Sequence, residues 1–159
     1  MFLWAKPTKN TQYPTLLKWY EQVVERKKDM YDNFMIVGEK FQNVIADGQV
    51  IGYQLGMRLC YYRGIVLSLI GTIALHVDGE EIAQDAMTVT VGGKVFPLSD
   101  LENQPVAKWE FGEVGILTVK KPGGLLPGEH KVELREHLKI SYVPVGFSGA
   151  DTKVLSLAA

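Results

Sequence analysis

The run IGYQLGMRLCY, residues 51–61, decides the fold class. Its large apolar side chains stand at every second position: Ile51, Tyr53, Leu55, Met57, Leu59 and Tyr61. A period of two residues is typical of a β-strand that buries one face. Asp47 and Gly48 precede the run, and this pair favours the positive φ angles of a tight hairpin turn. The sequence therefore predicts a long strand that is entered through a hairpin.

Similar patterns follow along the rest of the chain after residue 37. Apolar residues alternate over 65–77, 87–96 and 132–142, and the turns between them carry Asp78-Gly79 and Gly92-Gly93. Strands joined by short turns, without intervening helices, exclude a parallel α/β sheet. The sequence predicts a mainly β fold, an antiparallel β-sandwich or a barrel. Glu136 stands on the apolar side of the last expected strand, which indicates a β-bulge or an edge position there.

The first 34 residues form a separate part, an N-terminal arm with an amphipathic helix, before a sandwich domain at 35–159. Apolar residues recur every three or four positions from Pro14 to Asn33, which predicts the helix. The helix could dock on its own domain. Alternatively the arm embraces another subunit, because Trp4 and its apolar neighbours Phe2, Leu3 and Tyr13 lie outside any periodic element.

The composition of the chain argues against several classes of protein. The 159 residues suit one domain, and 17 basic against 18 acidic residues argue against a binder of nucleic acid or anionic membrane. The single cysteine excludes an intramolecular disulfide scaffold and a cysteine-rich zinc module. There is neither an apolar run of about 18 residues nor a secretory signal, so we expect no membrane association and a cytoplasmic location.

Residues that could carry catalysis are few. His76, His130 and His137 are the only histidines, and a regular strand would point the last two to opposite faces, so no metal site is expected. Cys60 has no base or helix terminus near it in sequence that would lower its pKa. No phosphate-binding or dinucleotide motif is present, so no cofactor is expected on this chain. The chain alone does not resemble an enzyme.

Two irregular loops are the candidate binding elements. Residues 60–64 place Tyr62 and Arg63 at a strand end, and both are residue types that dominate interface hot spots. Residues 121–130 combine glycines and prolines with Leu125, Leu126 and His130. The second loop either packs over one end of the sandwich or is presented to a partner.

Five short motifs in register resemble the small β subunit of bacterial C-glycoside deglycosidases. The resemblance covers about residues 35–145. Its motifs are Tyr62-Arg63-Gly64, Val77-Asp78-Gly79-Glu80, Trp109-Glu110-Phe111-Gly112, Pro122-Gly123-Gly124-Leu125 with Gly128-Glu129-His130, and Ser141-Tyr142-Val143-Pro144.

The resemblance implies one subunit of a hetero-oligomeric, lyase-type enzyme. In that family the α subunit is a TIM-barrel protein that holds a divalent metal, usually Mn²⁺. Their complex cleaves the C–C glycosidic bond of 3-oxo-C-glucosides of flavonoids and related aromatics, by deprotonation at C2 and elimination. We then expect Tyr62, Arg63, Leu125, Leu126 and His130, and the Trp4 arm, at or near subunit contacts.

A carbohydrate-binding module is the alternative function. Such a module would use Trp109, Tyr61 and Tyr62 as stacking platforms and would fold as a monomer with these rings exposed. Tyr61 shares the parity of the core-like Leu59, and Trp109 that of Phe111, which favours burial of these rings instead.

Overall fold

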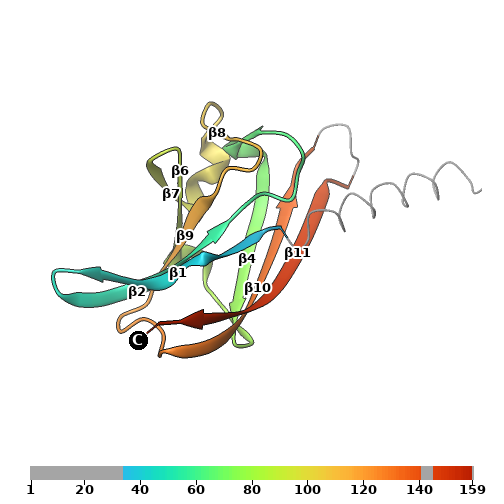
Figure 1. The fold of residues 1–159 in the computed structure, drawn as a ribbon. Helices are drawn as coiled ribbons and strands as arrows, with labels where there is room; N and C mark the ends of the chain where they lie inside the picture. The colour runs from blue at the N-terminus through green and yellow to red at the C-terminus, as the bar shows by residue number, and fades with distance from the viewer. Residues whose placement is uncertain (1–33, 141–144, 159) are drawn as a thin grey trace, which may run out of the picture.

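The protein folds as two antiparallel β-sheets. The structure, a computed structural model, describes residues 34–140 and 145–158 (Figure 1). The larger sheet has the order β1 (Ile36–Ala46), β2 (Gln49–Met57), β9 (Gly115–Lys120), β6 (Met87–Val91) and β7 (Lys94–Pro97). The smaller has the order β11 (Phe147–Leu157), β10 (Gly128–Leu138), β4 (Ile70–Val77) and β5 (Glu80–Glu81).

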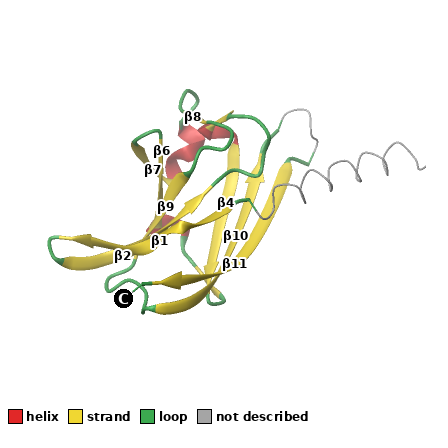
Figure 2. Cartoon of the chain, in the orientation of Figure 1, coloured by secondary structure: helices red, strands yellow, loops and turns green. Residues whose placement is uncertain are grey.

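Short elements complete the described part of the chain. A two-stranded ladder pairs β3 (Ile65–Val66) with β8 (Lys108–Trp109). Three 3-10 helices, η1 (Leu67–Leu69), η2 (Gln84–Ala86) and η3 (Leu98–Asn103), are the helical segments in Figure 2. The mainly β, antiparallel fold class is confirmed. The predicted helix at 14–33 and the Trp4 arm lie outside the described residues.

The core lies between the two sheets. Alternate residues of both sheets point inward and form one buried apolar cluster, as expected for a half-buried sheet face. The larger sheet contributes Tyr53, Leu55, Met57, Met87, Val89, Leu117 and Val119, and the smaller one Ile73, Leu75, Val132, Leu134, Leu138 and Phe147. The β-sandwich predicted from the alternation of residues is therefore present.

The tight turns form where the sequence predicts them. Asp47-Gly48 joins β1 to β2, Asp78-Gly79 joins β4 to β5, and Gly92-Gly93 joins β6 to β7. Both residues of each pair have positive φ angles, between 52° and 82°. Such turns twist in the same sense as the strands they join.

The run at 51–61 differs from the prediction at its end, because β2 stops at Met57. Its neighbour β9 begins at Gly115, opposite Met57, so no ladder partner is available further along on that side. Beyond this point the alternation is lost: Leu59, Cys60 and Tyr61 are all buried, and the Cys60 N–H donates to the Glu136 carboxylate instead.

Two other strand predictions also need correction. The expected strand at 65–77 is interrupted by η1, which leaves Leu69 partly exposed and turns Ile70 into the core. Strand β11 was not predicted at all. Its inward positions include Gly149, Asp151 and Lys153, so it lacks the apolar alternation that reveals the other strands.

Glu136 occupies neither a bulge nor an edge, so that prediction was wrong. It lies two residues before the end of β10, in register with Gly149 of β11 and Ile73 of β4, and its side chain is buried. Its Oε1 accepts the Cys60 N–H at 2.8 Å, a bond that joins the smaller sheet to the segment after β2. A buried carboxyl that accepts a buried backbone N–H offsets part of the cost of burying both groups.

Asp151 makes a second bond of the same kind between the sheets. Its Oδ2 accepts the Ile36 N–H at 2.9 Å, while Lys153 Nζ donates to the Ile36 carbonyl at 2.7 Å. The two side chains also form an ion pair, with Lys153 Nζ and Asp151 Oδ2 3.7 Å apart. Inward-facing charges on β11 thus satisfy the backbone of β1, which is an edge strand of the other sheet.

Burial governs the protonation of Glu136. Desolvation raises the pKa of this carboxyl to about 8; the bond from the Cys60 backbone opposes the rise, and the nearby Asp151 charge adds to it. In the unfolded chain the group returns to its ordinary pKa near 4.5. Between these two values the unfolded chain releases a proton that the folded chain retains, so rising pH favours unfolding.

We predict that Glu136→Gln removes a pH dependence of stability. In the wild type the free energy of unfolding should fall by about 1 kcal/mol per pH unit over this range. The neutral amide keeps an oxygen for the Cys60 N–H and does not titrate. The free energy of unfolding of the variant should therefore fall less steeply with pH than that of the wild type. Urea unfolding between pH 4.5 and 8 measures this. Glu129→Gln, on an exposed residue, is the control and should keep the wild-type slope; equal slopes in all three proteins would contradict the prediction.

Candidate functional site

His130 fixes the loop that leads into β10. Its Nδ1 lies 2.6 Å from Asp78 Oδ2, and its Nε2 lies 2.7 Å from the Leu126 carbonyl oxygen. Asp78 Oδ1 also accepts the Lys131 N–H at 2.9 Å. The His130 and Phe41 rings meet at a steep angle, edge to face, with the centroids 6.1 Å apart. One side chain therefore ties the 121–127 loop to the β4–β5 turn.

The two contacts of His130 require a charged ring. A carboxylate and a carbonyl oxygen are both acceptors, so both ring nitrogens have to carry a proton if both bonds form. The hydrogen bond to Asp78, and then the one to the Leu126 carbonyl, raise the pKa of His130. The bond from His130 and the Lys131 N–H lower the pKa of Asp78. Each group therefore favours the charged form of the other.

Asn43 holds the same loop from the other sheet. Its Nδ2 donates to the Leu125 carbonyl and its Oδ1 accepts the Leu125 N–H, both at 3.0 Å. Gly124 has to be glycine here, because its φ is +63° and a Cβ would lie 2.4 Å from Asn43 Oδ1. Leu125 is buried as a result, while Leu126 is 78% exposed. Sequence reasoning missed Asn43, which stands in an ordinary strand.

The loop with Tyr62 and Arg63 follows the Cys60 contact. Tyr62 is half-buried, with its ring centroid 4.6 Å from that of the buried Tyr61. The guanidinium of Arg63, an exposed residue, lies 5.5 Å from the Tyr62 ring centroid, within the range of a cation–π contact. Arg63 thus lies over the half-buried ring of Tyr62 at the surface.

The structure does not bring the two loops together. Leu126 and His130 lie at the beginning of β10, whereas Cys60, just before Tyr62, contacts Glu136 near its end. Six residues of strand separate His130 from Glu136, which is about 20 Å. The candidate contact residues therefore form two patches at opposite ends of the sandwich.

Burial of aromatic residues weighs against the carbohydrate-binding alternative. Trp109 is fully buried, with its Nε1 donating to the Glu113 carbonyl at 2.9 Å, and Tyr61 is also buried. Neither ring can act as an exposed stacking platform. Phe111 was expected to be buried with Trp109 but is 53% exposed, because β8 ends at Trp109 and the chain turns there. Its ring stacks on Phe34, with 6.2 Å between the centroids.

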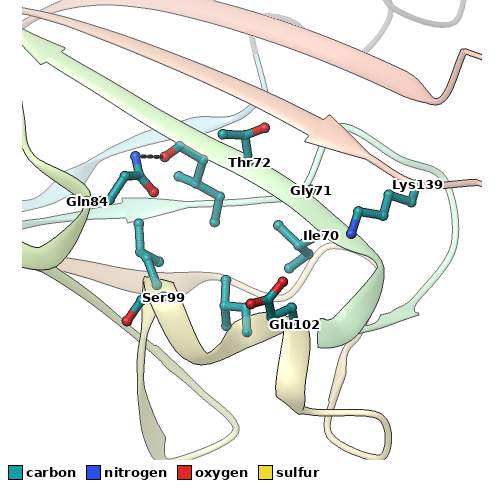
Figure 3. A pocket seen from close by; sticks show the side chains of 10 residues that line it. Ile70, Gly71, Thr72, Gln84, Ser99, Glu102 and Lys139 are labelled. Atoms are coloured by element: carbon teal, nitrogen blue, oxygen red, sulfur yellow. Dashed lines mark hydrogen bonds between the residues drawn. The ribbon is translucent and has the colours of Figure 1, made fainter.

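A pocket of about 330 Å³ lies between the start of β4 and η3 (Figure 3). Ile70 and Leu101 are among its apolar lining residues, and Lys139 and Glu102 supply a cation and an anion at one side. Gln84 Nε2 donates to the Ile73 carbonyl at 2.7 Å, which closes part of the open edge of β4. Sequence reasoning did not identify this pocket, whose residues come from four separate segments.

Potential metal ligands do not gather in the described ranges. No group of three His, Cys, Asp or Glu side chains there has the geometry to hold an ion. Cys60 is buried against Gly149, and His137 hydrogen-bonds to Ser148. No helix of the described part is long and apolar enough to cross a membrane.

Comparison with known protein sequences assigns the chain to a family. Residues 31–142 match the sequence pattern of the C-glycoside deglycosidase beta subunit. The chain belongs to this family. A relative named C-glycoside deglycosidase beta subunit, from Eubacterium cellulosolvens, is 33% identical over 105 residues. That alignment covers 65% of this chain and 71% of the relative.

The matched region of this deglycosidase β-subunit family spans both candidate loops. It begins just before β1 and ends shortly after β10, so β11 lies beyond it. Asp78, Gly124 and His130 all fall within it. The resemblance first seen in short motifs is therefore confirmed at the level of the family.

We predict that His130→Gln destabilises the protein in a pH-dependent way. Glutamine cannot bond both Asp78 and the Leu126 carbonyl as a charged ring does. The free energy of unfolding should therefore be lower than that of the wild type by about 1 kcal/mol at pH 6. Because the folded pKa of His130 is raised, its contribution is complete below the ordinary value of 6.5 and disappears as pH rises through the folded pKa. The free energies of unfolding of the wild type and of His130→Gln should therefore become equal at alkaline pH.

Urea unfolding of both proteins from pH 5.5 to 9 tests this. His76→Gln is the control, because His76 forms no ion pair in the described structure. A difference between wild type and His130→Gln that stays constant across this range would contradict a charged His130.

Proposed function

We propose that this chain is the accessory subunit of a heteromeric enzyme that cleaves the C–C glycosidic bond of 3-oxo-C-glucosides of flavonoids and related aromatics. The family match over residues 31–142 carries the proposal. The catalytic groups and a divalent metal, Mn²⁺ in this proposal, belong to a TIM-barrel α subunit. The β subunit covers part of the α subunit and shapes the complex, and it supplies no group that takes part in the reaction.

The bond itself explains why a ketone is needed on the sugar. A C–C glycosidic bond has no leaving oxygen to protonate, so the usual hydrolysis by two carboxylates does not operate. A carbonyl at C3 acidifies the proton at C2. A base removes that proton, a C1–C2 double bond forms as the bond from C1 to the aglycone breaks, and the aglycone carbon receives a proton. An oxidoreductase has to supply the 3-oxo substrate.

The hydrogen bonds that this chain's own ionisable groups make within the fold support an accessory role. Both nitrogens of His130 hold the 121–127 loop, and Asp78 holds His130 and the Lys131 backbone. The buried acids Glu136 and Asp151 accept backbone N–H groups between the sheets. Ionisable groups used in this way order the fold and the loops, and a partner then supplies the base and acid of the reaction.

The 121–127 loop is the better supported contact with the α subunit. Leu126 is strongly exposed, yet its backbone carbonyl is held by His130 and its neighbour Leu125 by Asn43. An exposed apolar side chain on a rigid backbone loses little conformational entropy on binding. Arg63, at the other end of the sandwich, would mark a second contact. Leu125 is buried and contributes by holding the loop.

We predict that Leu126→Glu weakens the complex with the α subunit about tenfold or more. Burying a carboxylate without a partner at an apolar contact is costly, whereas the exposed position leaves the isolated fold intact. Copurification with a tagged α subunit, followed by light scattering and by the rate of aglycone release, measures the effect. Val106→Glu is the matched control: Val106 is 83% exposed but outside both loops.

The same experiment separates the two contacts and the two functions. Arg63→Ala should weaken the complex if the Tyr62-Arg63 loop is a second contact. Full retention of complex and activity in both variants would reject these residues as the interface. A wild-type chain that captures no α subunit, but binds sugar as a monomer, would reject the accessory role and restore the carbohydrate-binding alternative.

A further inference from the structure

The outer face of the smaller sheet carries a hollow that the proposed function does not use. Its volume is about 350 Å³, and it lies over β4, β10 and β11, which run side by side with β10 in the middle (Figure 1). Its lining comprises Thr72, Ala74, Arg135, His137, Ser148 and Ala150, together with Gly149 and with Glu136, whose side chain is buried on the core side of the sheet. The outward-facing side chains on β10 are long and polar, whereas those on the two flanking strands are small.

Register explains the shape of this hollow. Arg135 pairs with Ala74 on one side and Ala150 on the other, so methyl groups flank the guanidinium-bearing strand. His137 pairs with Thr72 and Ser148, which places a hydroxyl group on each side of the ring. Residues directly opposite in an antiparallel sheet are close neighbours. A cation, an imidazole and two hydroxyls therefore surround one shallow space.

His137 is held in a defined orientation. Its Nδ1 lies 2.8 Å from Ser148 Oγ. Glycines flank the ring: a Cβ at Gly71 would lie 3.0 Å from His137 Cδ2, and one at Gly146 would lie 2.6 Å from its Cε1. In the tautomer with a proton on Nδ1, the ring donates to Ser148 Oγ, and the hydroxyl proton of Ser148 is free to bond a ligand.

Charge favours an anion in this place. Arg135 forms no ion pair with any residue in the described ranges. Two carboxylates share this face of β10: Glu129 lies at the far end of the strand, and the nearer one, Glu133, is paired with Lys131, with Nζ and Oε1 3.3 Å apart. Arg135 is therefore the cation on this strand that is left for a ligand, and its planar guanidinium suits two oxygens of a carboxylate or phosphate.

We propose that this hollow, formed by Arg135, His137, Ser148 and Thr72, binds a small oxyanion, a carboxylate or a phosphate group. The guanidinium pairs with two anion oxygens, and the hydroxyls of Ser148 and Thr72 donate to the remaining ones. The site is on the face opposite to the core and is separate from the Leu126 loop. It therefore stands or falls independently of the proposed contact at the Leu126 loop.

Titration of the full-length chain with inorganic phosphate and with acetate tests the proposal. Binding is measured by calorimetry at constant ionic strength with chloride as the balancing anion, and saturable binding of either anion is expected. Arg135→Gln should lower the association constant about tenfold or more, because it removes a charge-assisted bidentate pair. Ser148→Ala should lower it several-fold.

Lys131→Gln is the matched control. It removes the same unit of charge from the same face of β10, but from a residue already paired with Glu133. The association constant of this variant should stay within about twofold of the wild-type value. No saturable binding of either anion to the wild type would overturn the proposal. Equal losses in Lys131→Gln and Arg135→Gln would do so too, because they would reveal only a general surface field. Circular dichroism confirms that each variant is folded.

Discussion

Two buried carboxyl groups that accept backbone N–H groups across the sandwich are the constraint on which the rest of the structure depends. Glu136 bonds to Cys60, and Asp151 bonds to Ile36, in both cases from the smaller sheet to the chain of the larger one. Apolar packing between sheets has no direction, so it permits sliding. A buried hydrogen bond to one particular N–H does not. These two bonds set how β1 and the end of β2 lie on β10 and β11.

The loop with Tyr62 and Arg63 depends on this constraint. Where β2 leaves its ladder, the Cys60 N–H is buried, and Glu136 accepts it. The segment then crosses the core with Leu59, Cys60 and Tyr61 all buried, and only afterwards does it bring Arg63 to the surface. A buried acid in one sheet thus positions a surface cation that belongs to the other.

Sequence reasoning succeeded where one physical rule acts alone. Strand alternation and positive-φ turn residues were sufficient for the sandwich, its hairpins and most of its core. It failed where a polar residue takes a core position: Glu136 suggested a bulge, and Asp151 with Lys153 concealed β11. The site was reached only in part. His130 and Leu126 were named as candidates, and their place in a subunit contact stays a prediction. Asn43 and the partnership of His130 with Asp78 could not be predicted, because they come from contacts between residues 52 or more positions apart.

The motifs that connect this chain with its family act mainly on the fold. Asp78 holds His130 and Lys131, Trp109 bonds the Glu113 carbonyl from the core, and Gly124 gives Asn43 access to the loop. In this chain Asp78, His130 and Gly124 order the 121–127 loop, and Trp109 holds the turn that ends at Glu113. These loop contacts hold the backbone beside the exposed Leu126 in place, which is what the contact proposed above for this loop requires.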